Sequence, residues 1–248
     1  MDRTDPQDAD RLTELNKSPE RIAGMFDAIA GNYDFLNHLL SAGIDRRWRR
    51  KAIRSLNLSG RERVLDLCTG TGDLAIAAID AAPGAHSVLG VDFAAAMLRV
   101  GLAKTRARGL AERVTLVRGD AARIPVASGS VNAVTVAFGV RNVQNTQAAC
   151  DEMHRVLSPG GRLAVLEFAI PATPGIRGVY LWYFNHVLPR IGKLVSRHNA
   201  AYGYLPASVG AFASPDEFVK ILRQSGFDEI RAIPLTLGIV YLYTARRR

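Results

Sequence analysis

The turn from Asp66 to Asp73 is the part of this sequence whose residue types and spacing point most directly to chemistry. It reads Asp-Leu-Cys-Thr-Gly-Thr-Gly-Asp, and a further acid, Asp92, follows Gly72 by 20 residues. Glycines at this spacing with a later acid match the dinucleotide-binding fingerprint, in which the acid binds a ribose hydroxyl. The two acids that flank the turn would, however, repel a pyrophosphate at a helix N-terminus. The turn therefore favours a ligand that carries positive charge.

The same turn resembles the first motif of the Rossmann-like methyltransferases. In that class the acidic, glycine-rich motif binds the methionine part of S-adenosylmethionine, which brings an ammonium and a sulfonium, and the acid after the second strand binds the ribose. A third match is Gly119-Asp120-Ala121-Ala122, where the class uses an acid and its neighbour's amide to hold adenine. The resemblance implies S-adenosyl-L-methionine as the methyl donor. The cofactor-binding residues that it implies are Asp66, Gly70, Thr71, Gly72, Asp92, Asp120, Ala121 and Ala137.

Short apolar, β-branched runs alternate with helical segments from Arg63 onward, which is typical of a parallel sheet with crossover helices. The five strands predicted here are 63–67, 87–92, 114–118, 131–137 and 162–168. Two more runs, 229–237 and 239–245, are separated by Gly238 and predict a hairpin with one antiparallel edge strand. We expect an α/β, Rossmann-like class I methyltransferase fold, with a seven-stranded, mostly parallel sheet, an antiparallel C-terminal edge hairpin and helices on both faces.

A chain of 248 residues is long enough for one α/β core, so we expect a single domain over residues 1–248. Within it, residues 1–18 are polar and are expected to be disordered, and residues 19–58 are expected to form an N-terminal helical cap. Residues 171–214 are rich in aromatics and too long for an ordinary loop. We expect this insertion to cover the substrate, with a helix at 179–194.

Two further stretches narrow the family. The segments 33–48 and 155–167 resemble the corresponding motifs of the ubiquinone and menaquinone biosynthesis C-methyltransferases, and the Tyr-Asp, Asn, Ser and Trp positions of the first segment match. The resemblance runs from about residue 20 to the C-terminus. Asp45 stands where that family often has a histidine, so we assign no catalytic role to this position. Ser158 stands where the family usually has a lysine.

The family resemblance implies C-methylation of a polyprenylated quinol ring, and it covers both naphthoquinol and benzoquinol substrates. We expect demethylmenaquinol to be converted to menaquinol in menaquinone biosynthesis. Methylation of 2-methoxy-6-polyprenyl-1,4-benzoquinol in ubiquinone biosynthesis is the alternative.

Arg141 and Asn142 follow the fourth predicted strand, at the carboxyl edge where open α/β sheets bind ligands. The family resemblance implies that both residues face the quinol ring. A ring carbon becomes a nucleophile when an adjacent hydroxyl ionises, and arginine stays cationic in proteins. Arg141 is therefore expected to stabilise the phenolate or to orient a proton-accepting water. Asn142 and Tyr33 would position the ring, which makes these three the candidate catalytic residues.

The net charge of +9 and the pI near 10.0 suit an anionic partner, either nucleic acid or a lipid surface. A nucleic-acid methyltransferase would show Asn/Asp-Pro-Pro-Tyr/Phe or a cysteine nucleophile after the fourth strand, where residues 138–142 read Phe-Gly-Val-Arg-Asn. We therefore expect no nucleic-acid partner. The cations of residues 46–51, within one basic amphipathic helix predicted at 33–53, would face anionic headgroups in a peripheral membrane contact.

Cysteine usage and the absence of long apolar runs indicate the compartment. Cys68 and Cys150 are the only cysteines and form no Cys/His cluster, which argues against disulfides and structural zinc, so we expect no metal. No run approaches the roughly 18 apolar residues that would span a bilayer. We expect a cytoplasmic protein, at the inner face of the cytoplasmic membrane if the basic helix binds lipid. A non-catalytic cofactor-binding protein and a homodimer both stay open at this stage.

Overall fold

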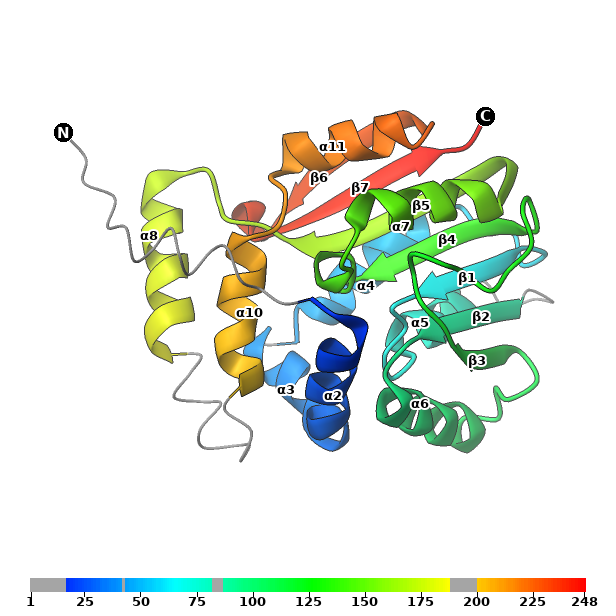
Figure 1. Cartoon of the computed structure of the whole chain (residues 1–248), viewed down its shortest axis with the longest axis horizontal. Helices are drawn as coiled ribbons and strands as arrows, with labels where there is room; N and C mark the ends of the chain where they lie inside the picture. Colours follow the sequence, from blue (N-terminus) through cyan, green and yellow to red (C-terminus); the bar gives the residue numbers. More distant parts are fainter. Residues whose placement is uncertain (1–16, 42, 82–86, 188–199) are drawn as a thin grey trace.

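The computed structural model describes residues 17–41, 43–81, 87–187 and 200–248. Its centre is a seven-stranded sheet with the strand order β3-β2-β1-β4-β5-β7-β6 (Figure 1). The strands are β1 (Arg63–Leu67), β2 (Ser87–Asp92), β3 (Val114–Arg118), β4 (Val131–Ala137), β5 (Leu157–Phe168), β6 (Asp228–Leu235) and β7 (Val240–Arg246). The first four have the bounds that the sequence predicts, because near-continuous apolar runs are typical of strands covered on both faces. The expected fold class is confirmed.

The C-terminal part of the sheet differs from the prediction in strand bounds and in strand order. β6 ends at Leu235 because Thr236–Gly238 form a 3-10 turn, and β7 starts at Val240. β7 pairs antiparallel with both β5 and β6, so it lies between them and the edge strand β6 runs parallel to the others. The antiparallel strand is therefore one place inside the edge of the sheet. β5 begins at Leu157 and not at Arg162, because Leu157 pairs with Val131 before a register shift in that ladder.

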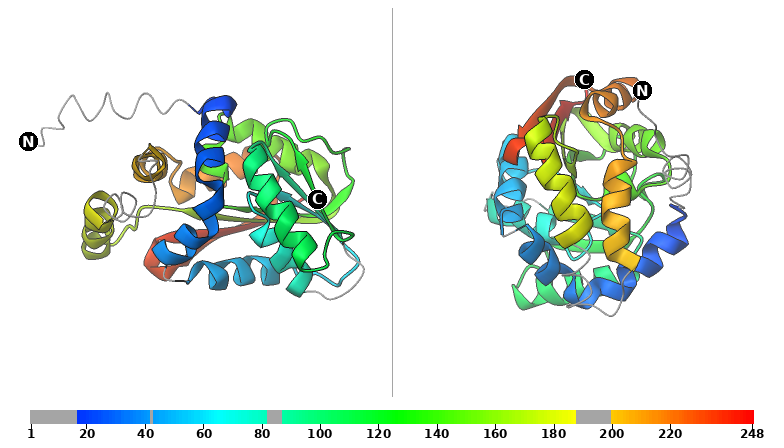
Figure 2. Two further views of the ribbon diagram at one scale, coloured as in Figure 1. Left: turned by 90° about the horizontal axis from the view of Figure 1, so that it is seen from below. Right: turned by 90° about the vertical axis from the view of Figure 1, so that its left-hand side faces the viewer.

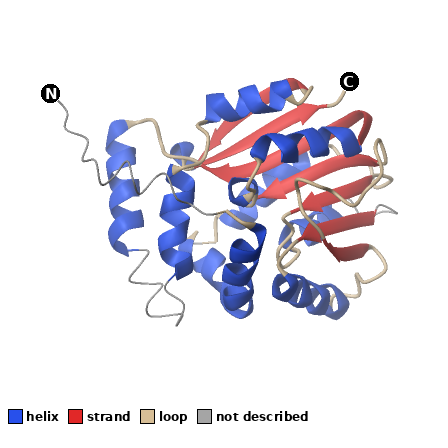
Figure 3. Ribbon diagram, viewed as in Figure 1, coloured by secondary structure: helices blue, strands red, loops and turns tan. Residues whose placement is uncertain are grey.

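Helices cover both faces of the sheet, as Figures 2 and 3 show. They are α4 (Asp45–Ser55) and α5 (Asp73–Ala81) on one face, and α7 (Thr146–Val156) and α11 (Pro215–Gln224) on the other, with α6 (Ala95–Ala107) against β2 and β3. Side chains of successive residues of β1 pack on opposite faces of the sheet. Leu65 belongs to the apolar core that includes Met153 of α7, and Val64 belongs to the core that includes Ile53 of α4.

The N-terminal segment contains α2 (Pro19–Ile29) and α3 (Tyr33–Leu40) before α4, with a short 3-10 turn at Ala30–Asn32. The prediction of one helix over residues 33–53 is therefore wrong. The chain leaves α3 where the Gly43 N–H donates to the His38 carbonyl at 2.8 Å, a bond that closes a helix C-terminus, and α4 starts afresh at Asp45. α4 buries Trp48 in the apolar core that also contains Ile53 and Val64, and the helical cap over residues 19–58 stays a prediction.

The insertion of residues 171–214 contains α8 (Pro174–Trp182), which continues into one π-helical turn at Tyr183–Val187, and α10 (Ala200–Gly210). The helix predicted at 179–194 therefore begins earlier. The described helices of the insertion lie at the carboxyl ends of the parallel strands, and α10 is the one beside α2 (Figure 1). Residues 188–194 lie outside the described part of the chain, as does most of the segment 1–18 that we expect to be disordered. Whether the insertion covers the substrate stays a prediction.

Candidate active site

The turn between β1 and α5, called the cofactor turn here (residues 66–73), is held by the end of the neighbouring strand β2. The Asp92 carboxylate accepts the Gly70 N–H at 2.8 Å and the Ala94 N–H at 2.9 Å. Gly70 and Gly72 have φ angles of +55° and +80°, a region that glycine adopts readily and other residues rarely. These two glycines let the chain reverse sharply, and Asp92 fixes the reversed turn in place.

Asp66 lies under the cofactor turn and is 1% exposed. Its carboxylate accepts hydrogen bonds from the Thr69 hydroxyl at 2.6 Å and from the Thr135 hydroxyl at 2.7 Å. Burial nevertheless raises the pKa of Asp66 to about 6, and burial also raises the pKa of Asp92. Within the described residues, neither carboxylate has a cationic side chain in ion-pair contact. Two buried acids of this kind fit the positively charged ligand that the sequence indicates.

A pocket of about 360 Å³, including its open mouth, lies between the cofactor turn and the N-terminal helices. Five of the residues that the sequence singles out line it: Tyr33, Gly70, Asp92, Ala137 and Asn142. The other lining residues are Phe26, Cys68, Phe93, Met97, Phe138 and Gly139. Apolar walls with a few polar groups are typical of small-molecule sites, and they keep water from reacting atoms. Candidate residues for the cofactor and for the ring therefore share one pocket.

The sequence does not single out three of the apolar lining residues, Phe26, Phe93 and Met97. Phe93 carries a usable signal, because it directly follows Asp92 at the carboxyl end of a parallel strand. Phe26 and Met97 lie on α2 and α6, where helical spacing does not distinguish a pocket wall from an ordinary core position.

Gly139 lets the segment after β4 approach the cofactor turn. A Cβ atom at this position would lie 2.2 Å from the Cβ of Cys68, which no side chain permits. Burial raises the pKa of the Cys68 thiol well above its usual range, so the thiol stays protonated. Cys68 is therefore a packing residue at this contact.

Arg141 lies behind the pocket wall and is buried. Its Nη1 donates to the Glu167 carboxylate at 2.8 Å and to the Phe138 carbonyl, and its Nε donates to the Ser208 hydroxyl at 3.3 Å. The guanidinium also lies over the Phe168 ring, 5.6 Å from its centroid. Arg141 thus touches a lining residue without being among the lining residues itself, and its role at the ring stays a prediction.

Asn142 and Tyr33, the other two catalytic candidates, do line the pocket. The Oδ1 atom of Asn142 accepts a hydrogen bond from the Tyr204 hydroxyl of α10 at 3.1 Å. Burial raises the pKa of Tyr33, so its phenol stays neutral and can donate a hydrogen bond at neutral pH.

Five cofactor-binding candidates lie outside the lining of this pocket: Asp66, Thr71, Gly72, Asp120 and Ala121. Asp120 is exposed and its Oδ1 accepts the Ala122 N–H at 2.9 Å, whereas Ala121 is buried. The Thr71 hydroxyl donates to Asp34 of α3. None of these five residues lines the pocket, and their roles toward the cofactor stay predictions.

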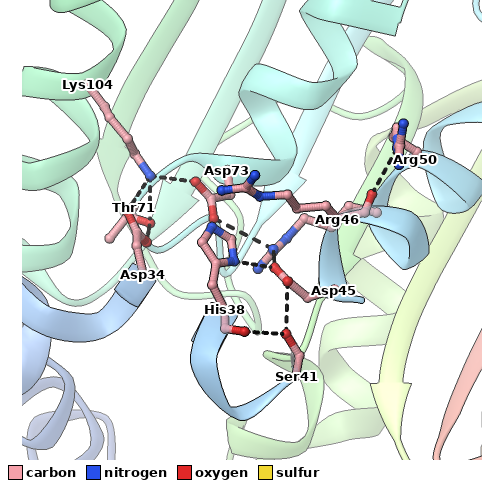
Figure 4. Close-up of polar contacts among 10 residues, drawn as sticks. Asp34, His38, Ser41, Asp45, Arg46, Arg50, Thr71, Asp73 and Lys104 are labelled. Atoms are coloured by element: carbon pink, nitrogen blue, oxygen red, sulfur yellow. Dashed lines mark hydrogen bonds and ion pairs between the residues drawn. The ribbon is translucent and has the colours of Figure 1, made fainter. Parts of the chain in front are cut away.

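An ionic network joins the N-terminal helices to the cofactor turn (Figure 4). The Lys104 ammonium donates to Asp34 at 2.6 Å, to the Thr71 hydroxyl at 3.2 Å and to Asp73. Arg49 of α4 lies 3.6 Å from the same Asp73 carboxylate. Burial opposes ionisation of Asp73, but Arg49 and Lys104 outweigh it and lower the pKa of this acid. Helices α3, α4 and α6 therefore all meet at the turn.

Asp45 extends the network into the connection between α3 and α4. It accepts a hydrogen bond from the Ser41 hydroxyl at 2.9 Å and lies 2.9 Å from the His38 Nδ1 (Figure 4). It also bonds Arg49, one turn further along α4. Asp45 is only 2% exposed. This position, where the resembling family often has a histidine, therefore stabilises the connection between the two helices.

The fold is that of the Rossmann-like methyltransferases, as solved structures show. The [4+2]-cyclase SpnF matches with a TM-score of 0.68 and 16% identity, covering 93% of this chain and 96% of that chain. Phosphoethanolamine N-methyltransferase 2 of Haemonchus contortus, in complex with S-adenosyl-L-methionine, matches with a TM-score of 0.62 and 15% identity, covering 81% of this chain and 52% of that chain.

The chain belongs to the ubiE/COQ5 methyltransferase family, whose model matches residues 14–247. It is 50% identical over 224 residues to the ubiquinone/menaquinone biosynthesis C-methyltransferase UbiE of Syntrophotalea carbinolica, covering 90% of this chain and 92% of the relative. It is 39% identical over 231 residues to the demethylmenaquinone methyltransferase of Bacteroides fragilis, covering 93% and 94%. The protein is an S-adenosylmethionine-dependent C-methyltransferase.

The raised pKa of Asp66 predicts that binding of S-adenosylmethionine strengthens between pH 5 and pH 7. Because the folded-state pKa lies above the ordinary value, ionising Asp66 costs folding free energy as the pH rises through about 6. A bound cation offsets that cost, so affinity should rise by up to about tenfold over this range. Titration calorimetry at several pH values measures the effect.

Asp66→Asn should remove this part of the pH dependence. The matched control is Asp80→Asn, an exposed acid of α5 that pairs with Arg108 at 3.2 Å, and it should leave the dependence intact. An identical pH dependence in wild type and Asp66→Asn would show that Asp66 does not titrate against the cofactor.

Lys104→Met should loosen α3 from the cofactor turn. The substitution leaves the carboxylates of Asp34 and Asp73 without their shared ammonium, and we expect a loss of about 1 kcal/mol in stability together with weaker cofactor binding. The control is Arg108→Met at the C-cap of α6, whose exposed partner Asp80 lies outside the cofactor turn. Equal cofactor dissociation constants for the two variants would contradict a role for the network in holding the turn.

Proposed function

We propose that the protein transfers a methyl group from S-adenosylmethionine to a ring carbon of a polyprenylated quinol, converting demethylmenaquinol to menaquinol in menaquinone biosynthesis. The name of the Bacteroides fragilis relative supports the naphthoquinol. The name of the Syntrophotalea carbinolica relative includes ubiquinone as well, so 2-methoxy-6-polyprenyl-1,4-benzoquinol is the alternative substrate.

One observation carries the proposal: Gly70 and Asp92, two cofactor-binding candidates, line the same pocket as Tyr33 and Asn142, two candidate ring-binding residues. Gly70 and Asp92 stand on one side, and Tyr33, Phe138 and Asn142 come from other elements. Methyl transfer requires the acceptor carbon, the methyl group and the sulfur in line, so donor and acceptor must enter one cavity. The aromatic walls would hold the flat ring and exclude water.

The cofactor brings the reactive methyl group on its sulfonium, and the chain supplies binding and charge. The buried Asp66 and Asp92 would hold the positively charged methionine part and the ribose, with Asp120 and Ala121 toward the adenine. Gly70, Thr71, Gly72 and Ala137 would complete the binding site. The raised pKa values of Asp66 and Asp92 support this arrangement, because a cation favours the ionised form of both.

On the acceptor side, Tyr33 and Asn142 would donate hydrogen bonds to the quinol oxygens. Ionisation of one hydroxyl makes the adjacent ring carbon nucleophilic. As that carbon bonds the methyl group, the methyl–sulfur bond would break and S-adenosylhomocysteine would leave, and the ring carbon would then lose its proton. Arg141 would stabilise the phenolate or orient a water that accepts this proton. Its Nε and Nη1 already have acceptors, whereas no acceptor is found for Nη2 among the described residues. This supports the proposed contact between Nη2 and the phenolate or the water.

A polyprenyl tail favours a peripheral membrane contact as part of the proposal. The exposed face of α4 carries five cations, Arg46, Arg47, Arg50, Lys51 and Arg54, which would attract anionic headgroups at about 1 kcal/mol each. Across the described residues, no helix is long and apolar enough to cross a bilayer. A cytoplasmic location at the inner membrane face, the homodimer and the lack of a nucleic-acid partner stay predictions.

The substrate assignment is tested by supplying both quinols with labelled S-adenosylmethionine and identifying the product by mass. We expect a methylated naphthoquinol. Arg141→Gln should lower turnover by about 100-fold, the loss typical of one charge-stabilising donor, while calorimetry still detects cofactor binding. Methylation of the benzoquinol alone would select the alternative substrate, and full turnover in Arg141→Gln would remove Arg141 from the reaction.

Membrane contact is tested by flotation with vesicles of anionic or of zwitterionic lipid. The double substitution Arg46→Glu and Lys51→Glu should abolish binding to the anionic vesicles, because it reverses two charges on the exposed face of α4. The control reverses Arg106 and Arg223 on other helices and should float like wild type. Flotation that is independent of anionic lipid would argue against the contact.

A further inference from the structure

Helix α10 of the insertion carries two hydroxyl side chains that contact the catalytic candidates directly. Tyr204 and Ser208 are four residues apart and therefore lie on one face of the helix. Tyr204 bonds Asn142, and Ser208 bonds Arg141, so the two consecutive candidates are each held by a residue from the same face.

We propose that Tyr204 and Ser208 are positioning residues for methyl transfer, so that the site reaches its reactive geometry only when α10 is docked on the 3-10 turn Val140–Asn142 that follows β4. This inference rests on the proposed roles of Arg141 and Asn142. The inference adds that the insertion is needed for the methyl-transfer step itself, and not only to cover the substrate.

The contact of Tyr204 with Asn142 sets the orientation of the amide. Because the Tyr204 hydroxyl donates to Oδ1 at 3.1 Å, the amide oxygen is turned toward α10. The NH₂ group then remains for the pocket that Asn142 lines, and it carries the only donors of this side chain. An amide turned the other way would present an acceptor to the quinol oxygen and would repel a phenolate. Burial raises the pKa of Tyr204, which keeps this phenol protonated.

The contact of Ser208 with Arg141 sets the plane of the guanidinium. Ser208 donates its one proton to the Leu205 carbonyl at 3.0 Å, which leaves its oxygen to accept from Nε of Arg141 at 3.3 Å. The other end of the group is held through Nη1 by Glu167 at 2.8 Å. Two anchors at opposite ends of a planar group fix its rotation, and with it the direction in which Nη2 points.

The burial of Ser208 argues against a purely structural reading of this residue. Ser208 is 0% exposed, and a buried hydroxyl is costly unless its hydrogen bonds are made. An alanine would fill the helix contact without that requirement. The helix also contains Pro206, which lacks an N–H and weakens the helix that presents the two hydroxyls. Docking of α10 therefore depends in part on the hydrogen bonds to Arg141 and Asn142.

The test uses Tyr204→Phe and Ser208→Ala in the full chain, assayed with the quinol that wild type methylates. Each variant should lower kcat about tenfold, the effect of losing one hydrogen bond, with the dissociation constant of S-adenosylhomocysteine unchanged within twofold. Ser208→Thr, which keeps the hydroxyl, should recover most of the activity. Matched controls are Tyr241→Phe, whose ring stacks on Tyr243, and Ser225→Ala, whose buried hydroxyl accepts from Gln147; both should retain wild-type kcat.

The pH profile separates positioning from loss of structure. If the amide and guanidinium stabilise the phenolate, their displacement raises the pKa of the bound quinol, so the rising limb of kcat should move to higher pH in both variants. A loss of folded protein lowers kcat equally at every pH and leaves the limb in place. An unmoved limb, or a kcat within twofold of wild type in either variant, would overturn the proposal.

The outcomes also distinguish this inference from the proposed function. If wild type methylates no quinol, the proposed function fails. If wild type methylates a quinol and Arg141→Gln is inactive while Tyr204→Phe and Ser208→Ala are fully active, only the positioning role fails.

Discussion

The buried carboxylate of Glu167 organises the substrate side of the site. One oxygen accepts the Arg141 Nη1 at 2.8 Å and the Phe168 N–H at 2.9 Å, and the other accepts the Arg141 N–H at 3.2 Å. A fully buried acid needs such partners, and removing one member of a buried pair typically costs about 3–5 kcal/mol. Because Glu167 stands on β5, this pair fixes the segment after β4 relative to the neighbouring strand. The pocket wall at Phe138 and Asn142 and the docking face for α10 follow from that position.

Much of the fold could be predicted from the sequence because local patterns decide it. The first four strands are apolar runs bounded by turns, and these patterns need no knowledge of distant residues. The break between α3 and α4 was harder to predict, since the helical spacing of apolar residues continues across it while Gly43 and Asp45 end one helix and start the next. The order of β6 and β7 depends on pairing with β5, which sequence alone does not encode in a short pattern.

The candidate site also contains residues that could be predicted from the sequence and contacts that could not. Gly70 and Asp92 could be predicted because motif spacing and the ends of parallel strands place them at one edge. The contacts of Arg141 could not be predicted, because Glu167 and Ser208 are distant from it in the chain. The family resemblance implies only that Arg141 faces the ring. The ionic network around Lys104 likewise joins residues 31 to 70 positions apart. The fold itself carries little of the function: a cyclase shares it at 16% identity, so the assignment depends on these side chains and on the family.

The position of β7 in the sheet has a consequence for how the protein is made. In the described sheet β6 pairs only with β7, and β5 pairs with β7 along one of its edges. The backbone groups along these edges of β5 and β6 therefore lack hydrogen-bond partners until residues 240–246 have joined. During synthesis these residues leave the ribosome after the other six strands of the described sheet. A nascent chain lacking them exposes two unpaired strand edges, which are templates for aggregation. Because Glu167 lies opposite Tyr241 in that ladder, the strand that carries the organising carboxylate gains its second neighbouring strand only in this last step.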